Sequence, residues 1–270
     1  MNDSRRTMNV LYKYVPPART DVLRDGRIRY TQPMVFNDPF ESKPHVASMP
    51  PRELMERVSK IESERMQLSD QERRAILKAA EDREHYAKVE AAMMMMMGTM
   101  VGVLSLTEKC SNLLMWAHYA AEHTGFVIGF DTTHRFWNNF GDDKGNDHVG
   151  VLRKVDYSEK RPSIAHLAKM TLAETYFAKS REWEYEQEWR VFRGMEKADH
   201  VIELSDDAPP ICLFNFPKDS VCEVVLGCRS TQALHNAVVE ILRGSPEYAK
   251  TQLMCAEIDE AEFKLNFKPV

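Results

Sequence analysis

Residues 184–190 read EYEQEWR, a charged stretch set between segments that carry strand and helix patterns. We expect Glu184–Phe192 to form a strand, in which successive side chains point to opposite faces. This alternation places one set of side chains together on one face: Glu184, Glu186, Glu188 and Arg190.

The segments on either side of this stretch support the same fold class. Alternating or apolar runs predict strands at Val10–Tyr14, Arg27–Thr31, Met100–Leu106, Gly125–Asp131, Gly150–Tyr157, Val201–Leu204, Val221–Leu226 and within Thr251–Phe267. Helical spacing predicts helices at Arg19–Asp25, Leu113–Glu122, Ser163–Lys179 and Thr231–Arg243. Because these elements alternate without regular β-α-β repeats, we expect a single α+β domain over residues 1–270, with a mixed, largely antiparallel β core and peripheral helices.

Residues 51 to about 97 differ from their surroundings, since apolar positions there recur at helical spacing within dense charge. Ser69 and Glu72 have the spacing of a capping box, which predicts two helices broken near Leu68–Asp70. We therefore expect a helical hairpin inserted into the β-rich core. For the run Met93–Met97, core packing is favoured over an exposed partner-binding or lipid-facing patch, because flexible thioethers fill irregular core space well.

Composition limits the possible functions. The chain has 270 residues, of which 43% are hydrophobic, and a net charge of −5, which gives no overall attraction to nucleic acid. Five cysteines without CxxC spacing disfavour a disulfide framework and a zinc site. The sequence lacks a signal-peptide pattern and an apolar run long enough to span a membrane, so we expect a cytoplasmic protein. It also lacks GxSxG, Walker, HExxH and GxGxxG patterns, which lowers the weight of hydrolase triads, nucleotide hydrolysis and dinucleotide-linked redox chemistry.

The carboxylates of the EYEQEWR stretch allow two interpretations. Neighbouring like charges are tolerated on a solvated strand with Arg190 as counter-charge, whereas in a cleft they raise one another's pKa. Trp183 and Trp189 are large residues for a plain surface, which favours a cleft slightly. The segment Asn37-Asp38-Pro39 also allows two interpretations. It is a strong turn former, although Asp38 and Glu41 also suit a hard cation.

Several motifs together resemble a widespread bacterial family of unknown function. They are LYKY (11–14), PMVFNDPFE (33–41), SLTEK (105–109), MWAHYA (115–120), GFVIGFD (125–131), and Lys179 with EYEQEWR. A second resemblance is to the mono-ADP-ribosyltransferase fold, which carries a polar residue on its first strand, a Ser-Thr-Ser-type strand and a Glu-x-Glu element. The chain departs from that pattern in having Lys13 where Arg or His is usual, and Ser-Leu-Thr as the middle element.

The second resemblance implies a core like that of ADP-ribosyltransferases and NAD as co-substrate, without a metal. It implies two catalytic carboxylates, with Glu188 stabilising the oxocarbenium-like ribose and Glu186 orienting or deprotonating the acceptor. The residues implied to contact the cofactor are Lys13, Tyr14, Arg29, Ser105, Thr107, Trp116 and Tyr119. The acceptor would be a macromolecule, protein or nucleic acid. Toxins of this kind act in toxin–antitoxin or anti-phage systems, which implies a neutralising partner protein.

Two other functions stay open at this point. A metal-dependent nuclease or phosphodiesterase would use a set of acidic residues with one lysine: Asp38, Glu41, Glu186, Glu188 and Lys179. A non-catalytic regulatory module would instead dock a partner on residues 51–97.

Overall fold

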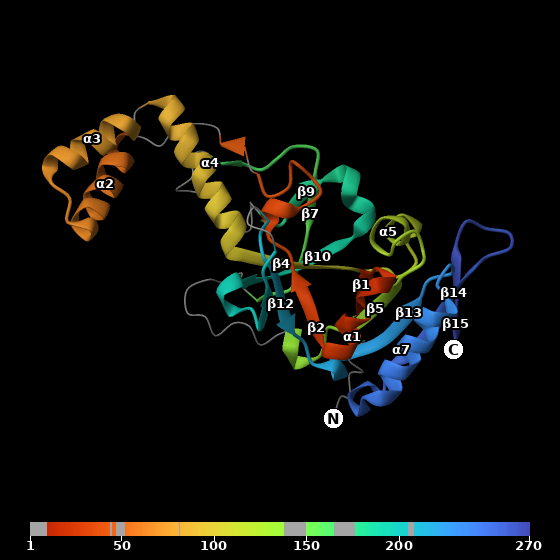
Figure 1. Ribbon diagram of the computed structural model, residues 1–270. Coiled ribbons are helices and arrows are strands. Elements are labelled where there is room, and N and C mark those ends of the chain that lie inside the picture. Colours follow the sequence, from red (N-terminus) through yellow and green to blue (C-terminus); the bar gives the residue numbers. More distant parts are fainter. Residues whose placement is uncertain are drawn as a thin grey trace, which may run out of the picture.

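The chain folds into a sheet-containing body and a helical arm that projects from it (Figure 1). The computed structural model describes residues 10–43, 45–46, 52–80, 82–137, 150–164, 176–204 and 208–270. Within these residues, no helix is long and apolar enough to cross a membrane.

The body is built on one eight-stranded sheet. Its strands, in spatial order, are β15 (Leu265–Pro269), β14 (Gln252–Ile258), β13 (Val221–Leu226), β5 (Phe126–Asp131), β1 (Val10–Val15), β4 (Val101–Thr107), β10 (Glu188–Gly194) and β6 (Arg153–Lys154). All neighbours in this sheet are antiparallel except β13 and β14, which are parallel. The prediction of a mixed α+β fold with a largely antiparallel sheet is therefore confirmed.

Smaller sheets flank the large one. A three-stranded antiparallel sheet consists of β11 (His200–Ile202), β12 (Ile211–Asn215) and β2 (Arg27–Tyr30). A bridge between Thr31 and Val103 ties it to β4. Two short parallel pairs are β3 (His45–Val46) with β8 (Ser163–Ile164), and β7 (Asp156–Ser158) with β9 (Ala178–Ser180). These pairs bring β9 close to the start of β10, which matters for the site.

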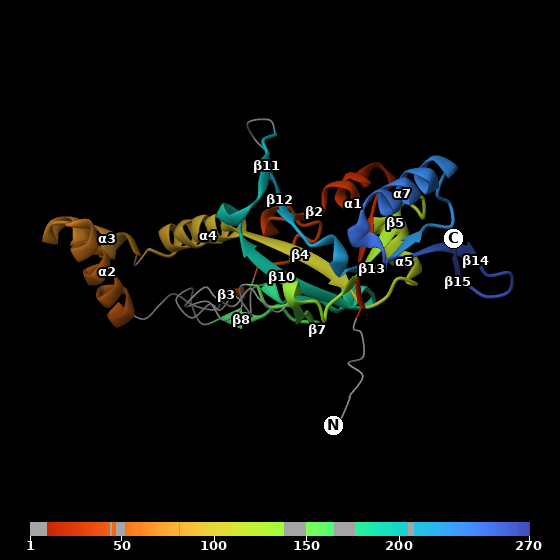
Figure 2. The same cartoon turned by 90° about the horizontal axis from the view of Figure 1, so that it is seen from below.

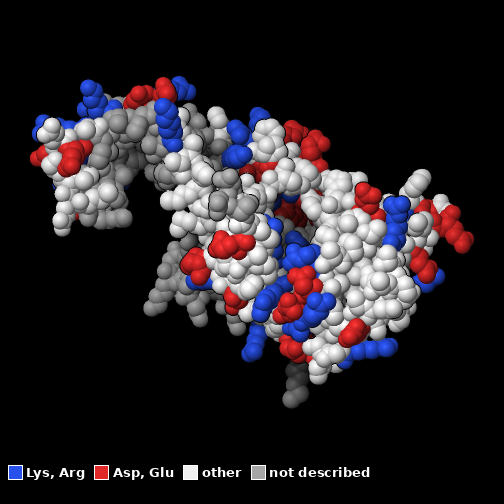
Figure 3. Space-filling model, in the orientation of Figure 1, with Lys and Arg blue, Asp and Glu red and all other residues white. Residues whose placement is uncertain are grey.

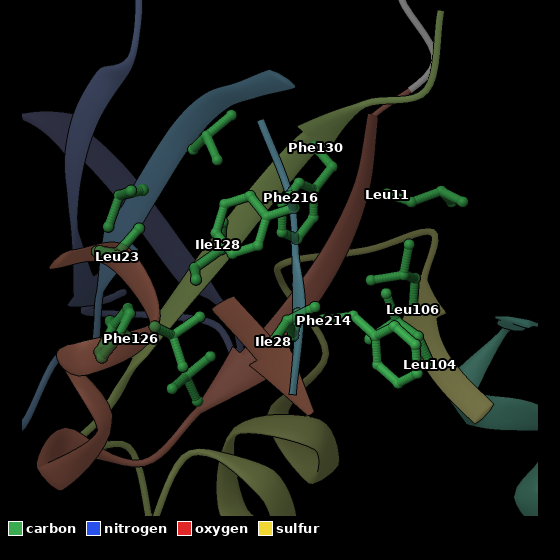
Figure 4. Packing of buried hydrophobic residues seen from close by; sticks show 14 of the residues in the cluster. Leu11, Leu23, Ile28, Leu104, Leu106, Phe126, Ile128, Phe130, Phe214 and Phe216 are labelled. Carbon is green, nitrogen blue, oxygen red and sulfur yellow. The ribbon is translucent and has the colours of Figure 1, made fainter. Parts of the chain in front are cut away.

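Hydrophobic residues cover both faces of the large sheet, because adjacent residues of β5 such as Val127 and Ile128 are both fully buried. On one face, Ile128 packs with residues of α1 (Asp21–Asp25) and α7 (Gln232–Gly244), and Figure 4 shows part of this cluster. On the other face, Val127 packs with α5 (Leu113–Tyr119). Short 3-10 turns in the described part of the chain connect these elements. They are η1 (Pro17–Arg19), η2 (Pro33–Val35), η3 (Arg135–Trp137), η5 (Arg181–Glu186), η6 (Met195–Lys197), η7 (Lys218–Ser220) and η8 (Pro246–Tyr248).

The arm contains three helices rather than the predicted hairpin of two. They are α2 (Arg52–Met66), α3 (Asp70–Ala80) and α4 (Arg83–Met100). The predicted capping box is present, since the Glu72 backbone N–H donates to the Ser69 hydroxyl while Glu72 accepts from the Ser69 N–H. A second cap starts the additional helix, because Asp82 accepts from the Glu84 N–H. Figure 2 shows this arm reaching away from the sheets.

The interpretation of the methionine run as core packing is wrong for Met95 and Met96, whose side chains are 62% and 54% exposed. They lie on α4, which contacts the body through η2, β4 and η6 and so leaves much of its surface without a covering element. The side chains of Met93 and Met97 lie outside the described part.

The prediction of a continuous strand over Glu184–Phe192 is also wrong. Residues Arg181–Glu186 form a 3-10 turn, Gln187 has a left-handed backbone (φ 45°), and the strand begins only at Glu188. Contacts from distant residues hold this turn, since Thr107 donates to the carbonyl of Glu186 and Asn112 to that of Tyr185. The alternation expected for four charged side chains therefore does not apply.

Two other predicted elements differ from the structure. The strand expected at Gly150–Tyr157 is divided into β6 and β7. A helix was expected at Ser163–Lys179, but the structure has strand β8 where that segment begins and strand β9 where it ends. Its middle, residues 165–175, lies outside the described residues. Strand pairing with distant segments thus overrides the local helical pattern at both ends.

Candidate active site

A cavity of about 450 Å³ opens where β1 and β4 diverge. The two strands share a single residue pair, Tyr12 with Thr107, so the sheet splits beyond it. Lys13 reaches across the split, and its Nζ donates to the Ser105 carbonyl at 3.0 Å. Figure 3 shows a hollow near the middle of this face with acidic atoms at its base. We call this space the charged cavity. Its volume of about 450 Å³ is typical of sites that bind small molecules.

Five buried charged residues form a connected group beside the charged cavity. We call them the charge network: Glu41, Lys179, Glu186, Glu188 and Arg190. Lys179 Nζ lies 2.6 Å from Glu186 Oε2 and 3.1 Å from Glu188 Oε2. Arg190 holds both oxygens of Glu188, with Nε to Oε1 and Nη2 to Oε2 each at 2.8 Å. Glu41 contacts Arg190 Nη2 and lies 3.6 Å from Lys179 Nζ.

The pKa values of two carboxylates in the charge network are shifted in opposite directions. Burial opposes ionisation of Glu188, but the charges of Arg190 and Lys179 outweigh it and hold its pKa well below the ordinary value. For Glu41 burial is the stronger effect, and its pKa is raised despite Arg190 and Lys179. Glu188 is thus kept ionised, while Glu41 takes up a proton more readily than an ordinary glutamate does.

Glu186 is held by a different pair of groups. The Tyr119 hydroxyl donates to Glu186 Oε1 at 2.5 Å, and Lys179 occupies the other oxygen. Burial, followed by the nearby charge of Glu186, raises the pKa of Tyr119. The hydroxyl therefore keeps its proton and acts as a fixed donor on the wall of the charged cavity.

Lys13 is the third cation near the charged cavity and the one least committed to a carboxylate. Burial lowers its pKa, and the charges of Glu188 and Glu186 only partly oppose this effect. An anion that entered the cavity would stabilise the protonated form of Lys13 and so bind favourably beside it.

The structure brings most of the residues predicted for the site to the charged cavity. Seven line it: Lys13, Tyr14, Ser105, Thr107, Tyr119, Glu186 and Glu188. Two do not. Arg29 lies on β2 in the smaller sheet, paired with Leu213 of β12. Trp116 is completely buried, and its Nε1 donates to the Cys110 carbonyl at 2.7 Å, so it offers no free face to a cofactor.

The residues proposed as metal ligands have other roles in the structure. Asp38 Oδ1 accepts from the Phe40 N–H at 2.8 Å and so holds the predicted turn. The oxygens of Glu41, Glu186 and Glu188 face Lys179 or Arg190, which a bound cation would have to displace. Among the described residues, no group of three or more His, Cys, Asp or Glu side chains is arranged to hold a metal ion.

Two features of the site escaped the sequence reasoning. Arg190 was expected only as the counter-charge of a solvated strand, yet it is 1% exposed and orients Glu188. Tyr157 was not predicted, and its hydroxyl accepts from the Glu188 N–H at 2.8 Å. The Glu-x-Arg spacing on a strand was a usable signal for the first, because such residues share a face. Nothing local marked Tyr157.

Comparison with known proteins adds one match. A family described as "Protein of unknown function (DUF2971)" matches residues 115–191, which run from α5 to β10 and include Lys179, Glu186 and Glu188. No curated protein matches the chain, and no solved structure matches it. The matched stretch spans one wall of the charged cavity, whereas Lys13, Glu41 and Ser105 lie outside it.

Proposed function

We propose that the chain is an ADP-ribosyltransferase-like enzyme that uses NAD to modify a macromolecular acceptor, with the charged cavity as its active site. One observation carries the proposal: Lys13, Ser105 and Glu188 line the same cavity although they are far apart in sequence. These are the positions at which the chain resembles the transferase pattern. They come from three neighbouring strands of the large sheet, β1, β4 and the start of β10.

The pKa shifts suit the chemistry. Breaking the bond between the nicotinamide nitrogen and ribose C1′ sends the bonding electrons to nicotinamide and leaves positive charge on the ribose. An ionised carboxylate stabilises that charge, and Glu188 is held ionised by Arg190 and Lys179. The acceptor then forms a bond to C1′ and loses a proton, which Glu186, another carboxylate of the cavity wall, would accept.

The remaining residues of the cavity wall would position the co-substrate. Lys13 would meet a phosphate of NAD, since it is a half-buried cation without a carboxylate bonded to its Nζ among the described contacts. Tyr119 would hold Glu186 and present its ring to the cavity. A toxin of a toxin–antitoxin or anti-phage system, with a neutralising partner protein, is the biological role that this activity would fit.

The test is transfer of label from radioactive NAD by the purified chain, together with NAD hydrolysis. We expect Glu188→Gln to lower the rate about 10²- to 10³-fold, the loss typical of removing one electrostatic stabiliser. Glu184→Gln is the matched control, because Glu184 lies in the same segment but its side chain is 63% exposed. Its rate should equal that of the wild type.

Folding must be checked for Glu188→Gln, because the substitution removes one of the two carboxylates that contact the buried Arg190. Ser105→Ala provides a second, milder variant, since the Ser105 hydroxyl contributes to the lowered pKa of Glu188. Failure of the folded wild type to bind or cleave NAD would contradict the proposal. Activity that EDTA abolishes and that needs no NAD would favour a metal-dependent nuclease instead.

A further inference from the structure

A second cavity shares part of its wall with the charged cavity. It measures about 290 Å³, and both Glu41 and Lys179 line the two cavities. The rest of its wall comes from the turn at Asp38–Phe40, the segment Ser158–Pro162 and the end of β9. A molecule bound there would lie next to the charge network from another direction.

Two cations on the wall of the second cavity have no charged partner among the described residues. The side chains of Lys160 and Arg161 show no ion pair or hydrogen bond to any other described residue. The carboxylates of the same wall each have a contact, since Glu159 lies 3.4 Å from Arg181, Asp38 accepts from the Phe40 N–H and Glu41 contacts Arg190. An anion would therefore meet Lys160 and Arg161 first.

An exposed aromatic ring stands beside these cations. Phe40 lines the second cavity and is 63% exposed. Its position is fixed on both sides, because its N–H donates to Asp38 and the next residue, Glu41, is buried against Arg190. An exposed aromatic face and unpaired cations on the wall of one cavity provide both contacts that a nucleotide needs, stacking for its base and positive charge for its phosphate.

We propose that the second cavity binds single-stranded nucleic acid, with a base stacked on Phe40 and adjacent phosphates on Lys160 and Arg161. A phosphorylated peptide would use the cations but gain little from the exposed ring, so the nucleic acid is the better fit. The role of this strand as the acceptor rests on the function proposed above, whereas its binding does not. NAD in the charged cavity and the strand in the second cavity would then meet at Glu41 and Lys179.

The experiment measures binding of a fluorescein-labelled oligothymidylate about 12 nucleotides long by anisotropy, over a range of salt concentrations. We expect Phe40→Ala to weaken binding roughly 5- to 150-fold, as loss of one stacked base does. We expect the double variant Lys160→Ala/Arg161→Ala to lower the slope of log affinity against log salt by about 1.4.

Controls come from the hairpin formed by β14 and β15. Phe263 in its turn is fully exposed, and Lys264 and Lys268 are exposed cations that are each paired with a carboxylate of the same hairpin. The variants Phe263→Ala and Lys264→Ala/Lys268→Ala should bind the oligonucleotide as tightly as the wild type does.

Three results would overturn the proposal. They are no binding at low salt, equal binding by Phe40→Ala and the wild type, or tighter binding of a phosphoserine peptide than of the oligonucleotide. The two proposals can fail separately. A wild type that binds the strand but never consumes NAD overturns the transferase, and one that consumes NAD but does not bind the strand overturns only the second site.

Discussion

The charged residues of the charge network and those of the arm differ in how much water reaches them. In the pair Lys179–Glu186 each side chain is 4% exposed, whereas in the arm pair Lys88–Glu84 the exposures are 72% and 79%. The distance from the lysine Nζ to the glutamate oxygen is similar in the two pairs, 2.6 and 2.8 Å. Because water screens the arm pair but not the buried one, equal geometry carries unequal energies. Burial, not distance, shows which charges the fold depends on.

The largest effect should come from removing one cation of the charge network. Arg190→Leu leaves Glu41 and Glu188 buried without their main partner, and we expect it to lower the free energy of unfolding by about 3–5 kcal/mol. Urea denaturation at pH 7 measures this change. Lys88→Ala on the arm is the control and should change stability by less than about 0.5 kcal/mol. Equal effects in the two variants would abolish the distinction between the regions.

The buried charge network and exposed charged residues should also differ in how they make stability depend on pH. The folded-state pKa of Glu188 lies below its ordinary value of 4.5, so its contribution is complete above pH 4.5 and is lost as the pH falls below it. We expect Glu188 to account for up to about 1.4 kcal/mol of lost stability per pH unit in that range. Denaturation of Glu188→Gln at pH 5 and pH 3 should show a shallower loss than the wild type. Glu184→Gln should keep the wild-type loss, because its side chain is 63% exposed.

A smaller effect should come from the backbone that joins the two carboxylates. Gln187 lies between Glu186 and Glu188 with φ 45°, a conformation that β-branched residues adopt poorly. We expect Gln187→Val to lower the free energy of unfolding by about 1–2 kcal/mol, whereas Gln187→Gly should be nearly neutral. Thermal unfolding of the two variants compares them directly. Equal stability of both would show that this residue is free to leave the left-handed region.

The smallest effect should come from the methionines of α4. Met95→Ser and Met96→Ser remove exposed side chains, so each should change stability by less than about 0.5 kcal/mol. Urea denaturation measures both. A loss of more than about 1 kcal/mol would mean that these side chains pack against another element after all.

Local patterns predicted much of the fold. The strands β1, β2, β4, β5 and β13 lie where alternation or apolar runs placed them, and α5 lies within the helix predicted at Leu113–Glu122. The short helix α1 ends at Asp25 as predicted, and Gly26, with φ 66°, follows it. These elements could be predicted because adjacent residues determine them.

The site itself could be predicted only in part. Glu186 and Glu188, the pair predicted for the site, both line the charged cavity, although they do not lie on one straight strand as expected. The turn that brings them together depends on Thr107 and Asn112, which are 79 and 73 residues away from their partners. Tyr157 and the burial of Arg190 depend on the same long-range packing. No local pattern contains this information.

The direct passage from α4 into β4 has a mechanical consequence. The helix ends at Met100 and the strand begins at Val101, so no loop separates them. Ser105 and Thr107, at the wall of the charged cavity, follow within a few residues on the same strand. Because no loop separates α4 from β4, a displacement of α4 would act through the backbone directly on a strand that lines the charged cavity.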